Sequence, residues 1–326
     1  MPENPSSTKV LVLDQACDKY FDDLLCAAFP HVRFEACVNG VDAQRHASDF
    51  QPDVILSAKS RNIPGPMKRL AMQIPSVNWI QICGVGFDHV QPITDFSATV
   101  TNCAGVLSEF LGETIFGMML AMSYGFPAYF HQQIAKQWKP VPRRSISGKT
   151  VLIIGLGNVG RDVARRCKQS NMRVIGIRNR PIDTEFVDKV GGMDDLITLL
   201  GEADYVCLHT PLTDQTRAML GKAEFAAMKP GAFFLNGARG GIVDEGALLA
   251  ALESGHLAGA YSDVFETEPL PPDNPLWTAP NLIISPHTSD SIDDWERRYV
   301  VFFATNLERY LNGEPLLNVV NAKLGY

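Results

Sequence analysis

Short apolar runs alternate with longer segments of mixed polarity along the first third of the chain. Each run holds three to six residues and is flanked by polar or turn-forming positions, which favours a strand over a helix. Because helix-like stretches separate the runs, the pattern predicts strand–helix units and a parallel sheet flanked by helices. The expected strands are Val10–Leu13, Val32–Phe34, Val54–Leu56, Val77–Ile82 and Thr99–Thr101.

A second series of apolar runs with the same spacing begins after Ser147-Gly148-Lys149. Six strands at such spacing make a complete doubly wound sheet. The chain is therefore predicted to be an α/β protein with two doubly wound parallel-sheet domains. The strands of the second series are expected at Val151–Ile154, Arg173–Arg178, Tyr205–His209, Ala232–Leu235, Ala258–Asp263 and Leu282–Ser285.

Two further helical segments set the domain organisation. Apolar residues at 110, 111, 115, 118, 119, 122 and 126 predict one long, largely buried helix from Ser108 to about Ala135. Ser108 is its expected N-cap, and its Met and Phe side chains favour a core or a subunit interface. A final helix over Asp293–Leu311 is expected to return to the first sheet. The predicted domains are residues 1–103 with 290–326, and residues 104–289.

The composition excludes several classes of protein. With 326 residues, 46% of them hydrophobic and 20% charged, the chain is neither disordered nor fibrous. The 29 Lys and Arg against 36 Asp and Glu give a net charge of −7, so there is no basic excess for nucleic acid. The first residues lack the features of a secretory signal, and the apolar stretch Ile115–Met122 is too short to span a bilayer. These observations predict a cytoplasmic protein without a membrane partner.

The seven cysteines, at positions 17, 26, 37, 83, 103, 167 and 207, form no Cys-x-x-Cys pair. They also show no spacing typical of metal ligands. Since most lie in apolar strand-like or helical contexts, we expect reduced, buried thiols and no metal site.

A glycine-rich segment directly follows the strand Val151–Ile154. It reads Gly155-Leu156-Gly157-Asn158-Val159-Gly160 and leads into a helix with apolar positions at 159, 163, 164 and 167. In this setting the glycines permit a tight turn and a close approach to a pyrophosphate, whose negative charge the helix N-terminus faces. The alternative is a glycine-rich turn without a ligand. The residues expected to bind a dinucleotide are Gly155, Gly157, Asn158, Val159 and Gly160.

The next strand indicates which dinucleotide is bound. It ends at Arg178-Asn179-Arg180, 18 residues past Gly160, where an NAD-binding fold normally places a carboxylate for the ribose hydroxyls. An arginine at this point can pair with a 2′-phosphate through two donors. Arg178 and Arg180 therefore predict a preference for NADP(H), with NAD(H) as the other nicotinamide cofactor. The alternative is that both are solvated charges at a strand end.

Three later segments carry the side chains that hydride transfer to a 2-oxo acid requires. Each begins at the carboxyl end of an expected strand, the edge where open parallel sheets bind ligands. The reaction needs a fixed cation for the substrate carboxylate, a proton donor for the forming alkoxide and a neighbour that tunes this donor. Arginine, histidine and glutamate are suitable. The segments are Asn236–Gly241, Asp263–Pro269 and Ser285–His287.

With these segments the sequence resembles the D-isomer-specific 2-hydroxyacid dehydrogenase family over nearly the whole chain. The resemblance implies a Rossmann-type cofactor domain and a flavodoxin-like substrate domain, with the active site in an interdomain cleft. It also implies a homodimer formed through the helix that begins at Ser108. The residues that carry it are Gly84–Asp88, Thr101-Asn102, Gly155–Gly160, His209–Thr213, Met228–Gly231, Asn236–Gly241, Asp263–Pro269 and Pro286-His287.

The resemblance assigns the catalytic roles to three residues. It implies that Arg239 orients the substrate, that His287 is the acid/base, and that Glu268, directly before proline, pairs with His287. The Glu268 carboxylate is expected to favour protonated imidazole and to hold one tautomer of the ring. Glu266, in the same acidic segment, is expected to be a solvated loop residue.

Other matched positions concern the cofactor and the mouth of the pocket. The resemblance implies that Asp263 faces the nicotinamide amide and that His209 contributes only its backbone. It also implies that the adenosine and nicotinamide path is lined by Thr210, Pro211 and Ala238. After His287 the chain departs from the small residues and glycines common in the family, and Asp290 is expected to change the local electrostatics.

The loop Gly84-Val85-Gly86 is expected to present backbone N–H groups to the substrate carboxylate, through Val85 and Gly86. The chain favours a small substrate of the glyoxylate or hydroxypyruvate type. One alternative is a phosphoglycerate-type dehydrogenase that uses Lys59 and Arg61, which otherwise lie in a solvated loop. A second is a nucleotide-responsive corepressor that binds a partner peptide.

Overall fold

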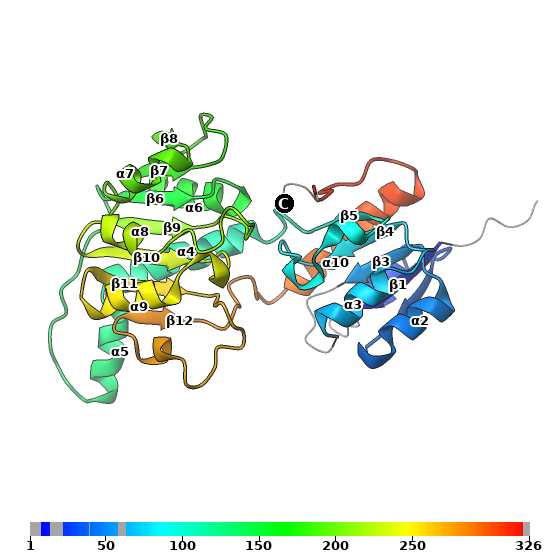
Figure 1. Ribbon diagram of the computed structural model, residues 1–326, viewed down its shortest axis with the longest axis horizontal. Helices are drawn as coiled ribbons and strands as arrows, with labels where there is room; N and C mark the ends of the chain where they lie inside the picture. The colour runs from blue at the N-terminus through cyan, green and yellow to red at the C-terminus, as the bar shows by residue number, and fades with distance from the viewer. Residues whose placement is uncertain (1–7, 14–21, 39, 58–62, 322–326) are drawn as a thin grey trace, which may run out of the picture. The chain divides into compact units, whose positions relative to one another are not determined.

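The computed structural model describes residues 8–13, 22–38, 40–57 and 63–321. The chain forms two compact units, of which unit 1 comprises residues 1–107 and 293–326 and unit 2 comprises residues 108–292. Each unit is an α/β structure with its own parallel sheet (Figure 1). The boundaries predicted from the sequence, after residues 103 and 289, lie four and three residues before these divisions.

Unit 1 is built on five parallel strands in the order β2-β1-β3-β4-β5. This order is flavodoxin-like, and each strand overlaps a predicted apolar run, which confirms the predicted fold class for this part of the chain. The strands are β1 (Lys9–Leu13), β2 (Arg33–Ala36), β3 (Val54–Ser57), β4 (Trp79–Ile82) and β5 (Thr99–Thr101).

Among the described residues, the α-helices of unit 1 are α2 (Ala43–Phe50), α3 (Gly65–Met72) and α10 (Trp295–Leu311), and a short π-helix covers Asp22–Cys26. Helix α10 packs on the sheet because its Phe303 ring stacks on Trp79 of β4, with centroids 5.3 Å apart. Both side chains are fully buried. Unit 1 therefore takes residues from both ends of the chain.

Unit 2 contains seven parallel strands in the order β12-β11-β10-β9-β6-β7-β8. This is the Rossmann order with one more strand at the β12 edge, so the order reverses between β6 and β9. The six predicted strands are present, but the expectation of only six was wrong. The strands are β6 (Thr150–Ile154), β7 (Arg173–Ile177), β8 (Lys189–Gly191), β9 (Tyr205–Leu208), β10 (Ala232–Asn236), β11 (Leu257–Ser262) and β12 (Leu282–Ile284).

Helices cover both faces of the unit 2 sheet (Figure 1). Strand residues alternate between two apolar cores: Phe234 faces the core formed with α7, α8 and α9, and Leu235 faces the core formed with α4 and α6. A buried side chain of this size contributes about 1.5–3 kcal/mol. The helices are α4 (Ser108–Ser123), α5 (Phe126–Ile134), α6 (Asn158–Gln169), α7 (Leu196–Leu200), α8 (Lys222–Ala227) and α9 (Glu245–Glu253).

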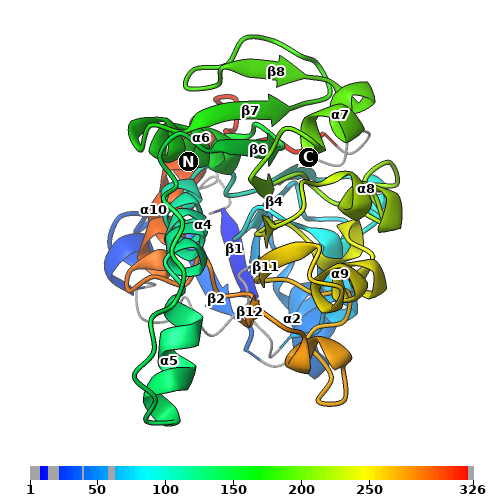
Figure 2. The same ribbon diagram turned by 90° about the vertical axis from the view of Figure 1, so that its left-hand side faces the viewer.

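The single long helix predicted from Ser108 to about Ala135 was wrong. The helix is interrupted at Gly125, whose φ of +71° lies in the left-handed region, and Pro127 stands in the first turn of the following helix α5. The Ser108 hydroxyl is buried and makes no hydrogen bond to any described residue, so its predicted capping role was also wrong. Helix α5 buries none of its side chains and projects from unit 2 in both views (Figures 1 and 2).

Two further observations concern membrane-spanning helices and the cysteines. In the part of the chain that the structure describes, no helix combines the length and apolar character needed to cross a bilayer. Of the cysteines among the same residues, all but Cys26 are buried. Burial accordingly raises the pKa of the Cys167 thiol to about 12.

Candidate active site

The predicted site residues of unit 2 follow strands whose carboxyl ends are in register. Ile154 of β6 pairs with Leu208 of β9, which pairs with Asn236 of β10, which in turn pairs with Ser262 of β11. The residues directly after these strands therefore lie along one edge of the sheet. This edge, at the point where the strand order reverses, is where open parallel sheets bind ligands.

The glycine motif forms the turn from β6 into α6, and a side chain would meet different surroundings at each of its three glycines. Gly155 has a φ of +101°, and a Cβ there would lie 2.5 Å from the His209 carbonyl oxygen. A Cβ at Gly160 would lie 2.0 Å from the Gly155 carbonyl oxygen, so Gly160 permits close packing of helix against turn. A Cβ at Gly157 would meet no atom of the described chain within 4 Å.

These residues fit a nicotinamide dinucleotide. The open space beside Gly157 adjoins the N-terminus of the twelve-residue helix α6, where backbone N–H groups and the helix dipole favour a pyrophosphate. Asn158 and Val159 form the first turn, with Asn158 exposed and its side-chain oxygen accepting a hydrogen bond from Arg161 at 2.7 Å. When bound, the nicotinamide supplies the hydride.

Arg178 and Arg180 lie just beyond the end of β7. Arg178 is partly buried, and its guanidinium is 3.5 Å from the Thr184 hydroxyl, whereas Arg180 is exposed. Among the described residues neither arginine has a carboxylate within ion-pair distance. The structure therefore places two cations at this strand end and no acidic residue that neutralises them.

The segments after β9 and β10 supply the remaining predicted cofactor residues. Thr210 is partly buried and Pro211 is exposed after β9, while Ala238 is 7% exposed and donates its N–H to the Asn236 side chain at 3.0 Å. His209, between strand and Thr210, has both ring nitrogens buried without a hydrogen-bond partner among the described residues. Burial lowers the pKa of His209 to about 4, so its ring is neutral near pH 7.

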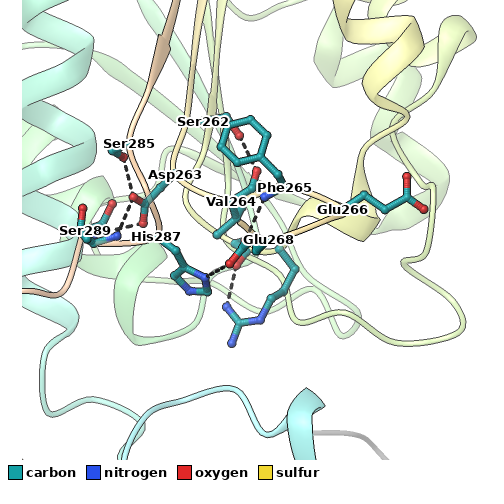
Figure 3. Close-up of polar contacts among 12 residues, drawn as sticks. Ser262, Asp263, Val264, Phe265, Glu266, Glu268, Ser285, His287 and Ser289 are labelled. Atoms are coloured by element: carbon teal, nitrogen blue, oxygen red, sulfur yellow. Dashed lines mark hydrogen bonds and ion pairs between the residues drawn. The ribbon is translucent and has the colours of Figure 1, made fainter. Parts of the chain in front are cut away.

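His287 and Glu268 form a hydrogen-bonded pair (Figure 3). The His287 Nδ1 atom lies 2.7 Å from Glu268 Oε2, and the two side chains are 30% and 35% exposed. Glu268 Oε1 accepts a hydrogen bond from the Phe265 N–H at 3.0 Å. Burial acts to raise the pKa of Glu268, but the bonds from His287 and Phe265 and the nearby Arg239 charge outweigh it and lower that pKa.

Arg239 follows β10 and is close to the same pair. A Cβ at Gly240 would lie 1.9 Å from the Phe265 carbonyl carbon, so glycine lets the Arg239 segment pack directly on the segment that carries Glu268. The Arg239 guanidinium donates to the Ala238 carbonyl at 2.7 Å. Glu266 is exposed and turned away from the pair (Figure 3).

This arrangement can protonate an alkoxide next to a bound carboxylate. Because Glu268 engages Nδ1 of His287, Nε2 is the ring nitrogen that could exchange a proton with a substrate. Arg239 provides the fixed cation, with two parallel N–H donors for a carboxylate. The structure thus brings Arg239, Glu268 and His287 together, as the sequence predicts, and their roles in turnover stay predictions.

Asp263 lies between these segments and has contacts that sequence reasoning missed. Its carboxylate accepts hydrogen bonds from the Ser285 hydroxyl at 2.5 Å and from the Thr288 and Ser289 N–H groups at 2.9 and 3.1 Å. Tyr261 and Ser289 were not predicted as site residues either. The only signal in the sequence is that polar residues interrupt the apolar strands near their ends. The predicted contact of Asp263 with the nicotinamide amide remains a prediction.

The predicted substrate loop belongs to unit 1. Gly84 has a φ of +138°, Val85 is 45% exposed, and Gly86 follows it in the turn after β4. The Asn102 side chain donates to the Val85 carbonyl at 2.9 Å and fixes this turn. Lys59 and Arg61, proposed for a phosphate, lie outside the described residues.

Comparison with known proteins identifies the class. Residues 116–289, more than half of the chain, match the family model of the D-isomer specific 2-hydroxyacid dehydrogenase, NAD binding domain. The chain belongs to this family, which confirms the resemblance seen in the sequence. It is therefore a nicotinamide-dependent enzyme that interconverts 2-oxo and 2-hydroxy acids.

Individual relatives agree with this class. Glyoxylate/hydroxypyruvate reductase B of Enterobacter sp. strain 638 is 31% identical over 292 residues, which are 87% of this chain and 89% of that protein. D-3-phosphoglycerate dehydrogenase of Methanocaldococcus jannaschii is 36% identical over 244 residues, 73% of this chain but only 46% of that relative. The solved D-isomer specific 2-hydroxyacid dehydrogenase of Xanthobacter autotrophicus Py2, in complex with NADPH and MES, has a TM-score of 0.83 at 29% identity and covers 98% of this chain and 100% of its own.

Proposed function

We propose that this enzyme reduces a small 2-oxo acid of the glyoxylate or hydroxypyruvate type, using NADPH. The observation that carries the proposal is the 2.7 Å pair of His287 and Glu268 beside Arg239, at the sheet edge that also holds the glycine motif. A relative that aligns along nearly its whole length is named for these two substrates. Val85 and Gly86 are proposed to bind the substrate carboxylate through their backbone N–H groups.

The proposed test is a panel of 2-oxo acids assayed with both NADPH and NADH. We expect glyoxylate or hydroxypyruvate to turn over at about 1 s⁻¹ or faster, the ordinary range for an enzyme. Preferred turnover of 3-phosphohydroxypyruvate would instead favour the phosphoglycerate-type alternative with Lys59 and Arg61. A protein that reduces no acid of the panel would overturn the proposed substrate class.

The proposed preference for NADPH rests on Arg178 and Arg180, which lie at the end of β7 with no carboxylate of the described residues within ion-pair distance. Arg178→Asp places a negative charge where a 2′-phosphate is proposed to lie, so it should weaken NADPH binding and shift preference toward NADH. Arg173→Asp, on the same strand but exposed at its opposite end and paired with Glu202, is the matched control. Tighter binding of NADH than NADPH by the parent enzyme would refute the preference.

We also propose a homodimer in the cytoplasm, where nicotinamide cofactors are supplied. Helix α5 and the segment after it expose Phe130, Ile134 and Trp138 to 65%, 81% and 101%, and a second copy of the chain is the proposed cover for these apolar side chains. Light scattering should give a dimer for the parent and a monomer for Phe130→Ser combined with Ile134→Ser. A parent monomer at micromolar concentration would overturn this proposal.

A further inference from the structure

The loop that carries His287 is held by a buried carboxylate (Figure 3). Asp263 is 2% exposed, and within the described residues it takes part in no ion pair. A buried carboxylate without a cation is costly unless several donors bind it. Here the donors are the Ser285 hydroxyl and the N–H groups of Thr288 and Ser289, so the loop over residues 285–289 must keep the conformation that presents them.

His287 itself is in an unfavourable backbone conformation that this anchoring maintains. Its φ is +55°, in the left-handed region, and its N–H donates to the Asp263 carbonyl at 2.8 Å. A non-glycine residue there costs on the order of 1 kcal/mol and persists where the surrounding contacts enforce it. The direction of the imidazole therefore depends on contacts made on both sides of His287.

The hydroxyl of Tyr261 connects these two sides. Tyr261 lies on β11, is 1% exposed, and its hydroxyl is 2.7 Å from Ser285 Oγ and 2.9 Å from Ser289 Oγ. Because the carboxylate only accepts, Ser285 donates to Asp263 and must accept from Tyr261, which in turn accepts from Ser289. This gives a directed chain of hydroxyl groups in which each bond strengthens the next.

We propose that Tyr261 is a positioning residue for the acid/base step. Its hydroxyl fixes Ser285 and Ser289, which surround His287 in sequence, and thereby holds the imidazole where Nε2 can deliver its proton. The proposal rests on the proposed role of His287. Sub-ångström misplacement of a proton donor lowers turnover, whereas the glycine motif follows a different strand, β6, and takes no part in these hydrogen bonds.

The test compares Tyr261→Phe with Tyr205→Phe in the full chain. Tyr205 is also 1% exposed and also lies in the unit 2 core, and its hydroxyl makes a buried hydrogen bond with Ser123 Oγ at 2.7 Å. Its hydroxyl bond to Ser123 and its ring contact with Phe233 involve no residue of the His287 loop. We expect Tyr261→Phe to lower kcat about tenfold with unchanged NADPH affinity, and Tyr205→Phe to leave both unchanged.

A second readout does not depend on turnover. The amide protons of Thr288 and Ser289 donate to Asp263, so their hydrogen exchange, measured by NMR, should accelerate at least about tenfold in Tyr261→Phe and not in Tyr205→Phe. Ser289→Ala should change both readouts in the same direction, and it remains informative if Tyr261→Phe unfolds. The proposal would be overturned if Tyr261→Phe and Ser289→Ala both kept their exchange rates and kcat within twofold of the parent. It would also be overturned if exchange accelerated equally in both tyrosine variants. A parent that reduces no 2-oxo acid would refute the function and leave the exchange test intact.

Discussion

A single methyl group at Gly157 should weaken dinucleotide binding without unfolding the protein. Gly157 has a φ of −76°, which alanine adopts without strain, and its Cβ would meet no atom of the described chain within 4 Å. The methyl group of Gly157→Ala would instead enter the space beside the N-terminus of α6, where the pyrophosphate is proposed to lie. Overpacked contacts typically cost about 1–3 kcal/mol, which corresponds to about 5- to 150-fold in the Kd for NADPH.

Two glycines of the same motif give the matched comparison. A Cβ at Gly160 would lie 2.0 Å from backbone, and one at Gly155 would lie 2.5 Å from backbone at a φ of +101°. Because backbone must move to relieve such contacts, Gly155→Ala and Gly160→Ala should lose at least about 2 kcal/mol of unfolding free energy. Gly157→Ala should stay within about 0.5 kcal/mol of the parent.

The assay pairs NADPH fluorescence titration with thermal unfolding followed by circular dichroism. Undiminished NADPH affinity in a folded Gly157→Ala would refute the proposed approach of the pyrophosphate. Equal loss of stability in all three variants would show that the space beside Gly157 is not open.

Three further predictions concern charge. Glu268→Gln removes the carboxylate that holds Nδ1 of His287 at 2.7 Å, so kcat for reduction should fall at least about tenfold while NADPH affinity stays unchanged; a kcat equal to the parent's would contradict the role. Arg239→Ala should raise KM and lower kcat, with at least about a hundredfold loss in kcat/KM from two charge-assisted hydrogen bonds, and unchanged steady-state kinetics would remove its role. His209 has a pKa of about 4 in the fold against 6.5 when exposed, because burial disfavours its protonated form. Its contribution to the free energy of unfolding is therefore fully present above pH 6.5. About 3 kcal/mol of this free energy is lost as the pH falls from 6.5 to 4. Chemical denaturation across this pH range should show that the free energy of unfolding falls less steeply in His209→Leu than in the parent. An equal fall in both proteins would show that His209 does not titrate this way.

Much of the fold follows from the sequence because parallel strands are buried on both faces and appear as apolar runs. Strand β8 escapes this signal because it has three residues, Lys189–Gly191, of which only Val190 is a large apolar side chain. It exists because it pairs with β7 through backbone hydrogen bonds. The break between α4 and α5 was predictable from Gly125 and Pro127, but the apolar periodicity continues across both residues and outweighed them.

The catalytic side chains were predictable because each follows a strand, and strand ends share an edge. The residues that hold these side chains in place were not predictable, since their contacts depend on loop conformation. Nothing local to Tyr261 indicates that its hydroxyl reaches Ser285 and Ser289, which are 24 and 28 residues away. The contacts of Asp263 require the left-handed backbone of His287, which histidine rarely adopts.

The return of α10 to the first sheet determines the order in which the chain can fold during synthesis. All of unit 2 leaves the ribosome before residues 293–326, which complete unit 1. Until then Trp79 has no Phe303 to stack on, and Gln81 lacks its buried hydrogen bond from Asn306. The unit encoded first is therefore completed last, and the apolar surface that α10 later covers, including Trp79, stays open to chaperones in the nascent chain.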